Sequence, residues 1–131
     1  MKISIIYDND ARDERLAPDW GFAALIEACG HTFLFDTGAN GRILLENMEK
    51  MGISPESIEE IFISHDHWDH TGGLMAVLEK KPVRVYVPDT IKKVPQAAET
   101  VPVSLSSKLH KHIYSTRSEE HTSELQSLLI I

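Results

Sequence analysis

The feature that most constrains this chain is a dense cluster of potential metal ligands. Residues 65–70 are His-Asp-His-Trp-Asp-His, which places three of the chain's seven histidines and two carboxylates in one short stretch. The cluster follows the apolar residues 61–63 and precedes Gly72 and Gly73. Imidazole nitrogens and carboxylate oxygens are ordinary ligands of zinc and related divalent ions. The pattern therefore favours a metal site over the alternative, a solvated polar loop.

The spacing inside the cluster indicates how the ligands are divided. In an extended or turning segment, His65 and His67 alternate and can point to one side. Asp69 and His70 follow in a tighter turn and can serve a second position, so the arrangement suits two neighbouring metal ions better than one. Asp66 points away by the same alternation, and we expect it to support the ligands through hydrogen bonds. The two following glycines are expected to permit close backbone passage beside the ligands.

These residues match the H-x-H-x-D-H signature of the metallo-β-lactamase-fold hydrolases, which the chain resembles over residues 1–116. Residues 33–38 resemble the F-D-T-G strand end that precedes the metal loop in that superfamily, and residues 20–27 resemble the strand before it. Residues 45–53 and 64–74 are similar to a subgroup named after ribofuranosylaminobenzene-phosphate synthase.

The resemblance implies an α/β fold, here the N-terminal half of a four-layer αβ/βα sandwich. It implies that His65 and His67 bind a first metal ion and that Asp69 and His70 bind a second. Asp69 would also orient the nucleophilic water, and Asp36 would be a buried carboxylate that supports the metal loop. A simple turn aspartate is the alternative for Asp36. The cofactors expected are two divalent ions, zinc foremost, with iron or manganese as alternatives.

The family completes its two sites with a histidine, a bridging acidic residue and a last histidine further downstream, and none of these is matched in this sequence. We therefore expect a truncated hydrolase that is inactive as written. Its complete form would cleave an ester, thioester, phosphodiester or similar bond in a small-molecule substrate. The alternatives are a nuclease or phosphodiesterase of the same fold and a non-catalytic half-domain that binds metal weakly or not at all.

The charge and the hydropathy of the sequence limit the kinds of partner that we expect. The formal net charge is −7, and no basic stripe is visible of the kind that neutralises nucleic-acid phosphates, so no nucleic acid is expected. No segment approaches the length of a membrane span, and the N-terminus lacks an apolar signal region. We expect a cytoplasmic protein that does not contact membranes, and the oligomeric state is left open. One sheet face of a half-sandwich lacks its partner, which predicts exposed apolar area.

The end of the chain differs from the rest. Most of residues 117–131 resembles the translation of a sequencing adapter, and Arg117 stands where the family pattern places glycine after residues 113–116. We expect a partial domain over residues 1–116 and a non-native tail over residues 117–131. A natural helical tail is the alternative, because residues 119–131 contain helix formers.

Apolar patterns and turn residues predict alternating strands and helices, as in the α/β class. Strands are expected over residues 3–7, 22–28, 32–35, 61–64 and 83–87. Helices are expected over residues 40–51, 54–60 and 74–80. Asn40 would cap the first helix, and Ser54 with Pro55 would open the second.

Two further features are expected to be structural. Cys29 ends an apolar run, which predicts a buried thiol. His110 and His112 alternate like a ligand pair, but no carboxylate or cysteine is near them in the sequence, which favours a solvated surface strand.

Overall fold

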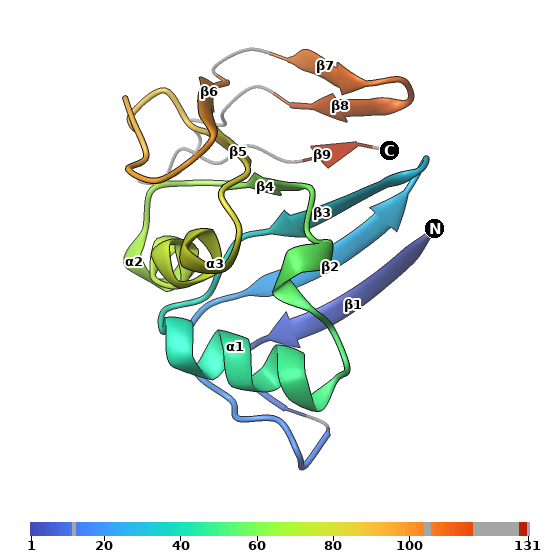
Figure 1. The fold of residues 1–131 in the computed structure, drawn as a ribbon, viewed down its shortest axis with the longest axis vertical. Coiled ribbons are helices and arrows are strands. Elements are labelled where there is room, and N and C mark those ends of the chain that lie inside the picture. The colour runs from blue at the N-terminus through green and yellow to red at the C-terminus, as the bar shows by residue number, and fades with distance from the viewer. Residues whose placement is uncertain (12, 104–105, 117–128, 131) are drawn as a thin grey trace.

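A six-stranded sheet forms the centre of the protein, whose computed structural model describes residues 1–11, 13–103, 106–116 and 129–130 (Figure 1). The strand order is β1-β2-β3-β4-β5-β6, and a second sheet has the order β7-β8-β9. The strands of the first sheet are β1 (Lys2–Tyr7), β2 (Ala23–Ala28), β3 (His31–Phe35), β4 (Glu60–Phe62), β5 (Arg84–Val87) and β6 (Glu99–Pro102). Those of the second are β7 (Ser107–His110), β8 (Ile113–Ser115) and β9 (Leu129–Ile130).

The helices are α1 (Gly41–Lys50), α2 (Trp68–Thr71) and α3 (Leu74–Lys80), with one 3₁₀ turn at Pro55–Ser57. The predicted N-terminal cap of α1 is confirmed: the side chain of Asn40 accepts hydrogen bonds from the backbone N–H groups of Arg42 and Ile43. Gly52, at φ 71°, follows the end of the helix, where a left-handed residue is common. The boundaries of α3 coincide with the predicted 74–80.

The predicted helix over residues 54–60 is wrong. The chain makes a single 3₁₀ turn there, and Ser54 donates its hydroxyl proton to Glu56 instead of capping the turn. The reason is the sheet: Glu60 already pairs with Phe33 in the parallel β3–β4 ladder, so the backbone must be extended by that residue.

The hairpin between β2 and β3 turns at Cys29 and Gly30. Both residues have positive φ, 54° and 77°, as a two-residue type I′ turn requires. The prediction that Cys29 is buried is wrong: it is exposed. Its place in the turn, beyond the last pair of the β2–β3 ladder, removes the side chain from the pleat that buries the apolar residues before it.

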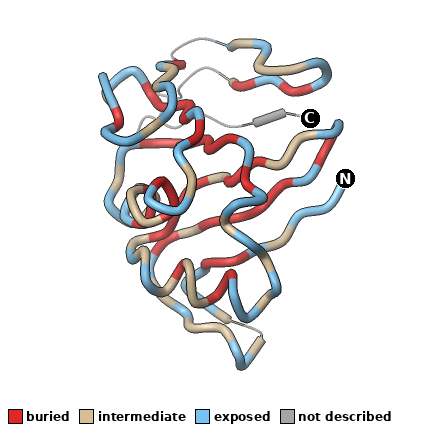
Figure 2. The backbone as a smooth tube through the Cα atoms, viewed as in Figure 1, coloured by how far each residue is buried: buried red, intermediate tan, exposed pale blue. Residues whose placement is uncertain are grey.

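The sheet packs on both faces. On one face, α1 and α3 bring Leu44, Met48 and Leu78 onto the strands. On the other face, Phe33, Phe62 and their neighbours pack against the β7–β8 hairpin through Ile113. Figure 2 shows the buried backbone concentrated along the middle strands of the sheet.

The edge strand β1 is less covered. Ile3 and Ile5, whose Cα partners in β2 are Ile26 and Ala24, are 55% and 51% exposed. Apolar surface of this kind was expected for a half-sandwich. The chain segment predicted to be non-native, residues 117–131, lies outside the described residues apart from β9, whose backbone pairs with β8. Among the helices that the structure describes, none is long and apolar enough to cross a membrane.

Candidate metal centre

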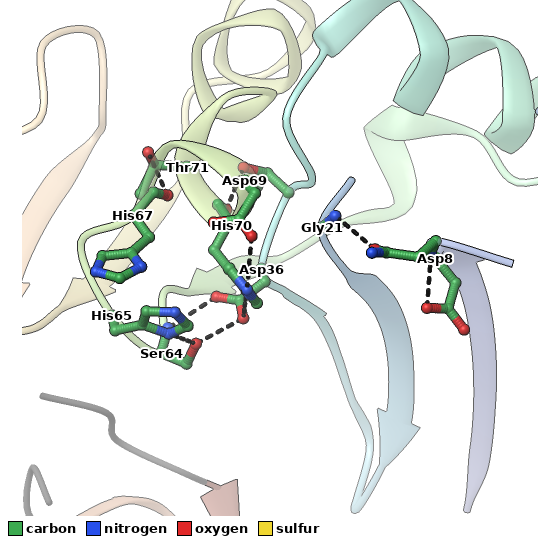
Figure 3. Close-up of polar contacts among 11 residues, drawn as sticks. Asp8, Gly21, Asp36, Ser64, His65, His67, Asp69, His70 and Thr71 are labelled. Carbon is green, nitrogen blue, oxygen red and sulfur yellow. Dashed lines mark hydrogen bonds and ion pairs between the residues drawn. The ribbon is translucent and has the colours of Figure 1, made fainter. Parts of the chain in front are cut away.

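The sheet topology brings the predicted ligands to one edge. β3 and β4 are parallel neighbours, so the residues that follow their last positions lie side by side. Asp36 follows β3, and Ser64 and His65 follow β4 after one further residue. Figure 3 shows these side chains converging with His67 and His70 from the loop that contains α2.

Asp36 is the buried anchor of this edge. Its Oδ1 accepts a hydrogen bond from the Ser64 backbone N–H at 2.8 Å, and its Oδ2 accepts one from the Ser64 hydroxyl at 2.6 Å. Oδ2 also lies 2.7 Å from Nδ1 of His70. The residue is 1% exposed and has φ 59°, a left-handed conformation that aspartate adopts more readily than most residues. These contacts are the kind that orients metal-binding imidazoles.

The three imidazoles of the motif lie close together. The ring centroids of His65 and His70 are 4.1 Å apart, and those of His65 and His67 are 4.8 Å apart. Candidate ligand atoms of Asp36, His65 and His70 all lie within 4.8 Å of one another. The Ser64 hydroxyl is 2.8 Å from Nδ1 of His65. Nδ1 of His65 and Nδ1 of His70 therefore each have a partner within the protein.

Asp69 and Asp66 differ in placement. Asp69 is half-buried, and its Oδ2 lies 3.8 Å from Nε2 of His70. Asp66 is exposed. This exposure agrees with the alternation inferred from the sequence, whereas the ligand and supporting roles stay predictions.

The loop is held by backbone hydrogen bonds as well as by Asp36. The carbonyl oxygen of His67 accepts from the backbone N–H of His70 and of Thr71, each at 2.9 Å, which forms the short helix α2. The hydroxyl of Thr71 donates to the same oxygen at 3.0 Å. Thr37 donates both its backbone N–H and its hydroxyl to the His70 carbonyl, each at 2.8 Å. The imidazoles are thus positioned from both ends of the loop.

Three glycines allow the loop to approach its neighbours. A Cβ at Gly72 would lie 2.0 Å from the Ala39 carbonyl oxygen, and one at Gly73 would lie 2.3 Å from that of Thr37. The expected role of these two glycines in close passage is confirmed. Gly21, at φ 114°, makes a similar approach, because its Cβ would lie 1.9 Å from the Asp69 carbonyl oxygen.

Tyr7 packs against the turn that follows Asp36. A Cβ at Gly38 would lie 2.6 Å from the Tyr7 ring, and the Tyr7 oxygen accepts a hydrogen bond from the Asn40 backbone N–H at 3.1 Å. Its hydroxyl donates to the Asp19 carboxylate. Burial, together with the hydrogen bond and the negative charge of Asp19, raises the pKa of Tyr7 to about 12.

Sequence reasoning missed Ser64, Thr37, Tyr7 and Gly21 as parts of this site. Ser64 and Tyr7 are ordinary residues near strand ends, and their type carries no specific signal. Thr37 belongs to the F-D-T-G match, and that match is the signal that could have pointed to it. A left-handed φ at position 21 could have been suspected because the residue is a glycine. The contact of Gly21 with Asp69 could not, since the two residues lie far apart in the sequence.

The donor set fits divalent ions of the zinc, iron and manganese type, because it combines imidazole nitrogens with carboxylate oxygens. The supporting contacts of Asp36 and Ser64 exist in the protein itself. These residues are therefore a candidate site for such an ion.

Comparison with known proteins points in the same direction. The family model of the Metallo-beta-lactamase superfamily matches residues 18–127. A 7,8-dihydropterin-6-methyl-4-(beta-D-ribofuranosyl)-aminobenzene-5'-phosphate synthase from Methanocaldococcus jannaschii is 36% identical over 92 residues, covering 63% of this chain and 31% of that protein. A Ribonuclease Z from Pyrococcus abyssi is 38% identical over 71 residues, covering 49% of this chain and 22% of the relative.

The fold is also found among solved structures. The Rm3 metallo-beta-lactamase superposes with a TM-score of 0.61 at 17% identity, covering 85% of this chain and 50% of that one. The α/β architecture predicted from the sequence is thus confirmed as part of this fold. The chain spans about a third of the length of the first of these relatives and half that of the solved structure.

Proposed function

The chain belongs to the metallo-beta-lactamase superfamily, and we propose that it carries the first part of a dinuclear metal centre that activates water for hydrolysis. The members of this superfamily are hydrolases, which supports an enzymatic role for the complete protein. The observation that carries the proposal is the convergence of His65 and His70 on the buried carboxylate of Asp36, with the His67 ring beside that of His65.

In this proposal His65 and His67 hold the first ion, and Asp69 and His70 hold the second. Divalent ions bound there would lower the pKa of a bound water to near 7 and polarise the bond under attack. Asp36 and Ser64 fix the imidazoles through their Nδ1 atoms, at 2.7 Å for His70 and 2.8 Å for His65. Such contacts set the tautomer and keep the rings from turning away.

Asp69 orients the attacking water. Its carboxylate lies beside Nε2 of His70, at 3.8 Å, and its backbone is fixed by the close approach of Gly21. A carboxylate in this position can accept a hydrogen bond from the attacking water, which fixes the orientation of the water, and can then accept its proton. The metal is zinc in this proposal, and iron or manganese could occupy the same donor set.

The substrate is a small molecule with an ester, thioester, phosphodiester or similar bond. Catalysis belongs to the complete protein, because the chain spans only part of its relatives and two ligands for each ion leave most coordination positions unfilled. The chain alone is then a half-domain with weak metal binding and no turnover.

Cleavage of a nucleic acid, by a nuclease or phosphodiesterase of the same fold, is a second candidate, favoured by the likeness to proteins named Ribonuclease Z. Against it stands the formal net charge of −7, since nucleic-acid binding surfaces are usually basic. Turnover of an RNA substrate and of small-molecule esters by the full-length protein, measured side by side, separates the two candidates.

The first test is a pair of zinc titrations by calorimetry. His67→Ala removes a half-buried ligand, and His112→Asn removes an exposed imidazole in the β7–β8 turn as the matched control. We expect weaker zinc binding for His67→Ala by about tenfold to a hundredfold or more, the scale on which even supporting residues act. Unchanged binding for both variants would overturn the assignment of the loop.

The role of Asp69 needs the full-length protein. Asp69→Asn there should keep most of its bound metal but lose turnover, because the amide accepts a proton poorly. Full turnover with metal still bound would show that Asp69 does not orient the water.

A further inference from the structure

A second group of imidazole and carboxylate side chains lies at the opposite edge of the six-stranded sheet. His31 opens β3, Glu60 opens β4, and His110 ends β7. The extended chain from Glu60 to His65 spans about 15 Å at the usual rise of a strand. The two groups are therefore separate, and neither shares a residue with the other.

The three side chains face one another across the two sheets. Nε2 of His110 contacts Oε1 of Glu60. The rings of His31 and His110 are stacked, with centroids 4.0 Å apart and an angle of 21° between their planes. Candidate ligand atoms of all three residues lie within 4.8 Å of one another.

The carboxylate of Glu60 is oriented by its neighbours. Its Oε2 accepts hydrogen bonds from the Tyr86 hydroxyl at 2.9 Å and from Nη1 of Arg84 at 3.3 Å. These contacts turn Oε1 towards the imidazoles. The charge of Arg84 is itself balanced, because its Nε donates to Oε1 of Glu99 at 2.6 Å. Glu60 is 7% exposed, so its carboxyl group is both buried and oriented.

A shared cation explains this arrangement better than protonation does. Two stacked imidazoles repel each other if both are protonated, whereas both can donate lone pairs to one ion. The ion would also neutralise the buried Glu60. Two histidines and one glutamate form a known zinc donor set with one open position. Oε2 of Glu59, 3.5 Å from Nδ1 of His31, lies next to the site.

We propose that His31, Glu60 and His110 form a second zinc site that ties β7 to the starts of β3 and β4. Ligand atoms around tetrahedral zinc lie about 3.3 Å apart, so the two partly exposed rings would have to turn out of their stack until one nitrogen of each points at the ion. The site does not depend on the function proposed for the loop at the other edge.

The test counts zinc bound to the chain after equilibrium dialysis, with metal analysis. Glu60→Gln and His110→Asn each remove one proposed ligand. His112→Asn is the matched control: His112 is exposed two residues further on and has φ 69°, which asparagine tolerates. We expect both ligand variants to hold one equivalent less than the unaltered chain, with affinity at this site weaker by about a hundredfold. The control should hold the same zinc as the unaltered chain.

A second measurement guards against misfolded variants and against zinc at the loop. In the unaltered chain, the imidazole NMR signals of His31 and His110 should shift together on zinc addition, and they should still do so when His67→Ala has weakened the loop site. Equal zinc content in all the proteins, or His31 and His110 signals that respond to pH but not to zinc, would overturn the proposal and leave an ion pair only.

Discussion

The two edges of the central sheet carry similar side chains that are assembled in different ways. At the edge where β3 and β4 end, the imidazoles come from residues 65–70, and one buried aspartate orients them. At the edge where these strands begin, the imidazoles come from two distant elements, and His110 lies 50 residues from Glu60 in the sequence. One edge is built by local chain geometry, and the other depends on the docking of a second sheet.

This difference decides what can disturb each edge. The loop is held by backbone hydrogen bonds, by glycine contacts and by Asp36. The His110 edge relies on the β7–β8 hairpin, which packs on Phe33 through Ile113 and Leu109. Damage to the anchor of one edge should therefore leave the other edge intact, and the three predictions below use that independence.

The largest effect is expected for Asp36→Ala. The change leaves the Ser64 backbone N–H and hydroxyl and Nδ1 of His70 without their buried acceptor. Loss of a buried charged partner of this kind costs about 4 kcal/mol of the free energy of unfolding. Urea denaturation measures it, and zinc titration should show weaker binding at the loop.

Asp36→Asn is the matched control for that prediction. Asparagine tolerates the φ of 59° and keeps one carbonyl acceptor, so its loss of stability should be smaller. The stacking of His31 and His110, monitored by NMR, should survive both changes. If Asp36→Ala unfolds with the free energy of the unaltered chain, Asp36 is not the anchor of this edge.

The same contrast explains what the sequence could reveal. The metal loop could be predicted from the sequence because its candidate ligands are nearly consecutive residues. Helices α1 and α3 could be predicted because helix caps and apolar spacing are local signals. The cluster of His31, Glu60 and His110 could not be predicted from the sequence, because none of the three residues stands out from the residues next to it in the chain. Only the pairing of β3 with β4 and the docking of β7 bring its members together.

The incorrect expectations have the same origin. Cys29 ends an apolar run, but the positive φ of the turn places it at the surface. The 54–60 segment has helix-start residues, but the parallel pairing of Glu60 requires extended chain. His110 was expected on a solvated strand because no carboxylate was near it in the sequence, whereas the fold brings Glu60 to it. In each case a tertiary constraint overrides a local preference.

The second prediction compares one glycine from each edge. Gly72→Ala places a Cβ 2.0 Å from the Ala39 carbonyl oxygen, so the backbone must move. We expect a loss of about 3 kcal/mol, the upper part of the range for overpacking. Gly30→Ala meets nothing within 4 Å, and its positive φ alone should cost about 1 kcal/mol. Urea denaturation of both variants checks the order, and equal losses would show that the loop is not tightly packed.

The third prediction compares one tyrosine from each edge through the dependence of the free energy of unfolding on pH above pH 10. Burial, the hydrogen bond and the charge of Asp19 raise the pKa of Tyr7 to about 12, whereas an unfolded tyrosine titrates near 10. Below pH 10 the phenol is neutral in both states, and its contribution to stability is complete. Between pH 10 and 12 the unfolded chain ionises first, so stability falls, by about 2 kcal/mol for Tyr7.

Tyr86, which donates to Glu60 at the other edge, also has a raised pKa, with burial as the main cause. Stability of the unaltered chain, Tyr7→Phe and Tyr86→Phe should therefore be compared from pH 8 to 12. Each variant should lose less stability between pH 10 and 12 than the unaltered chain does, because one phenol no longer ionises. If Tyr7→Phe loses as much stability between pH 10 and 12 as the unaltered chain does, the phenol of Tyr7 does not support the loop edge. The hydrogen bonds of Tyr7 would then not distinguish the loop edge from the His110 edge.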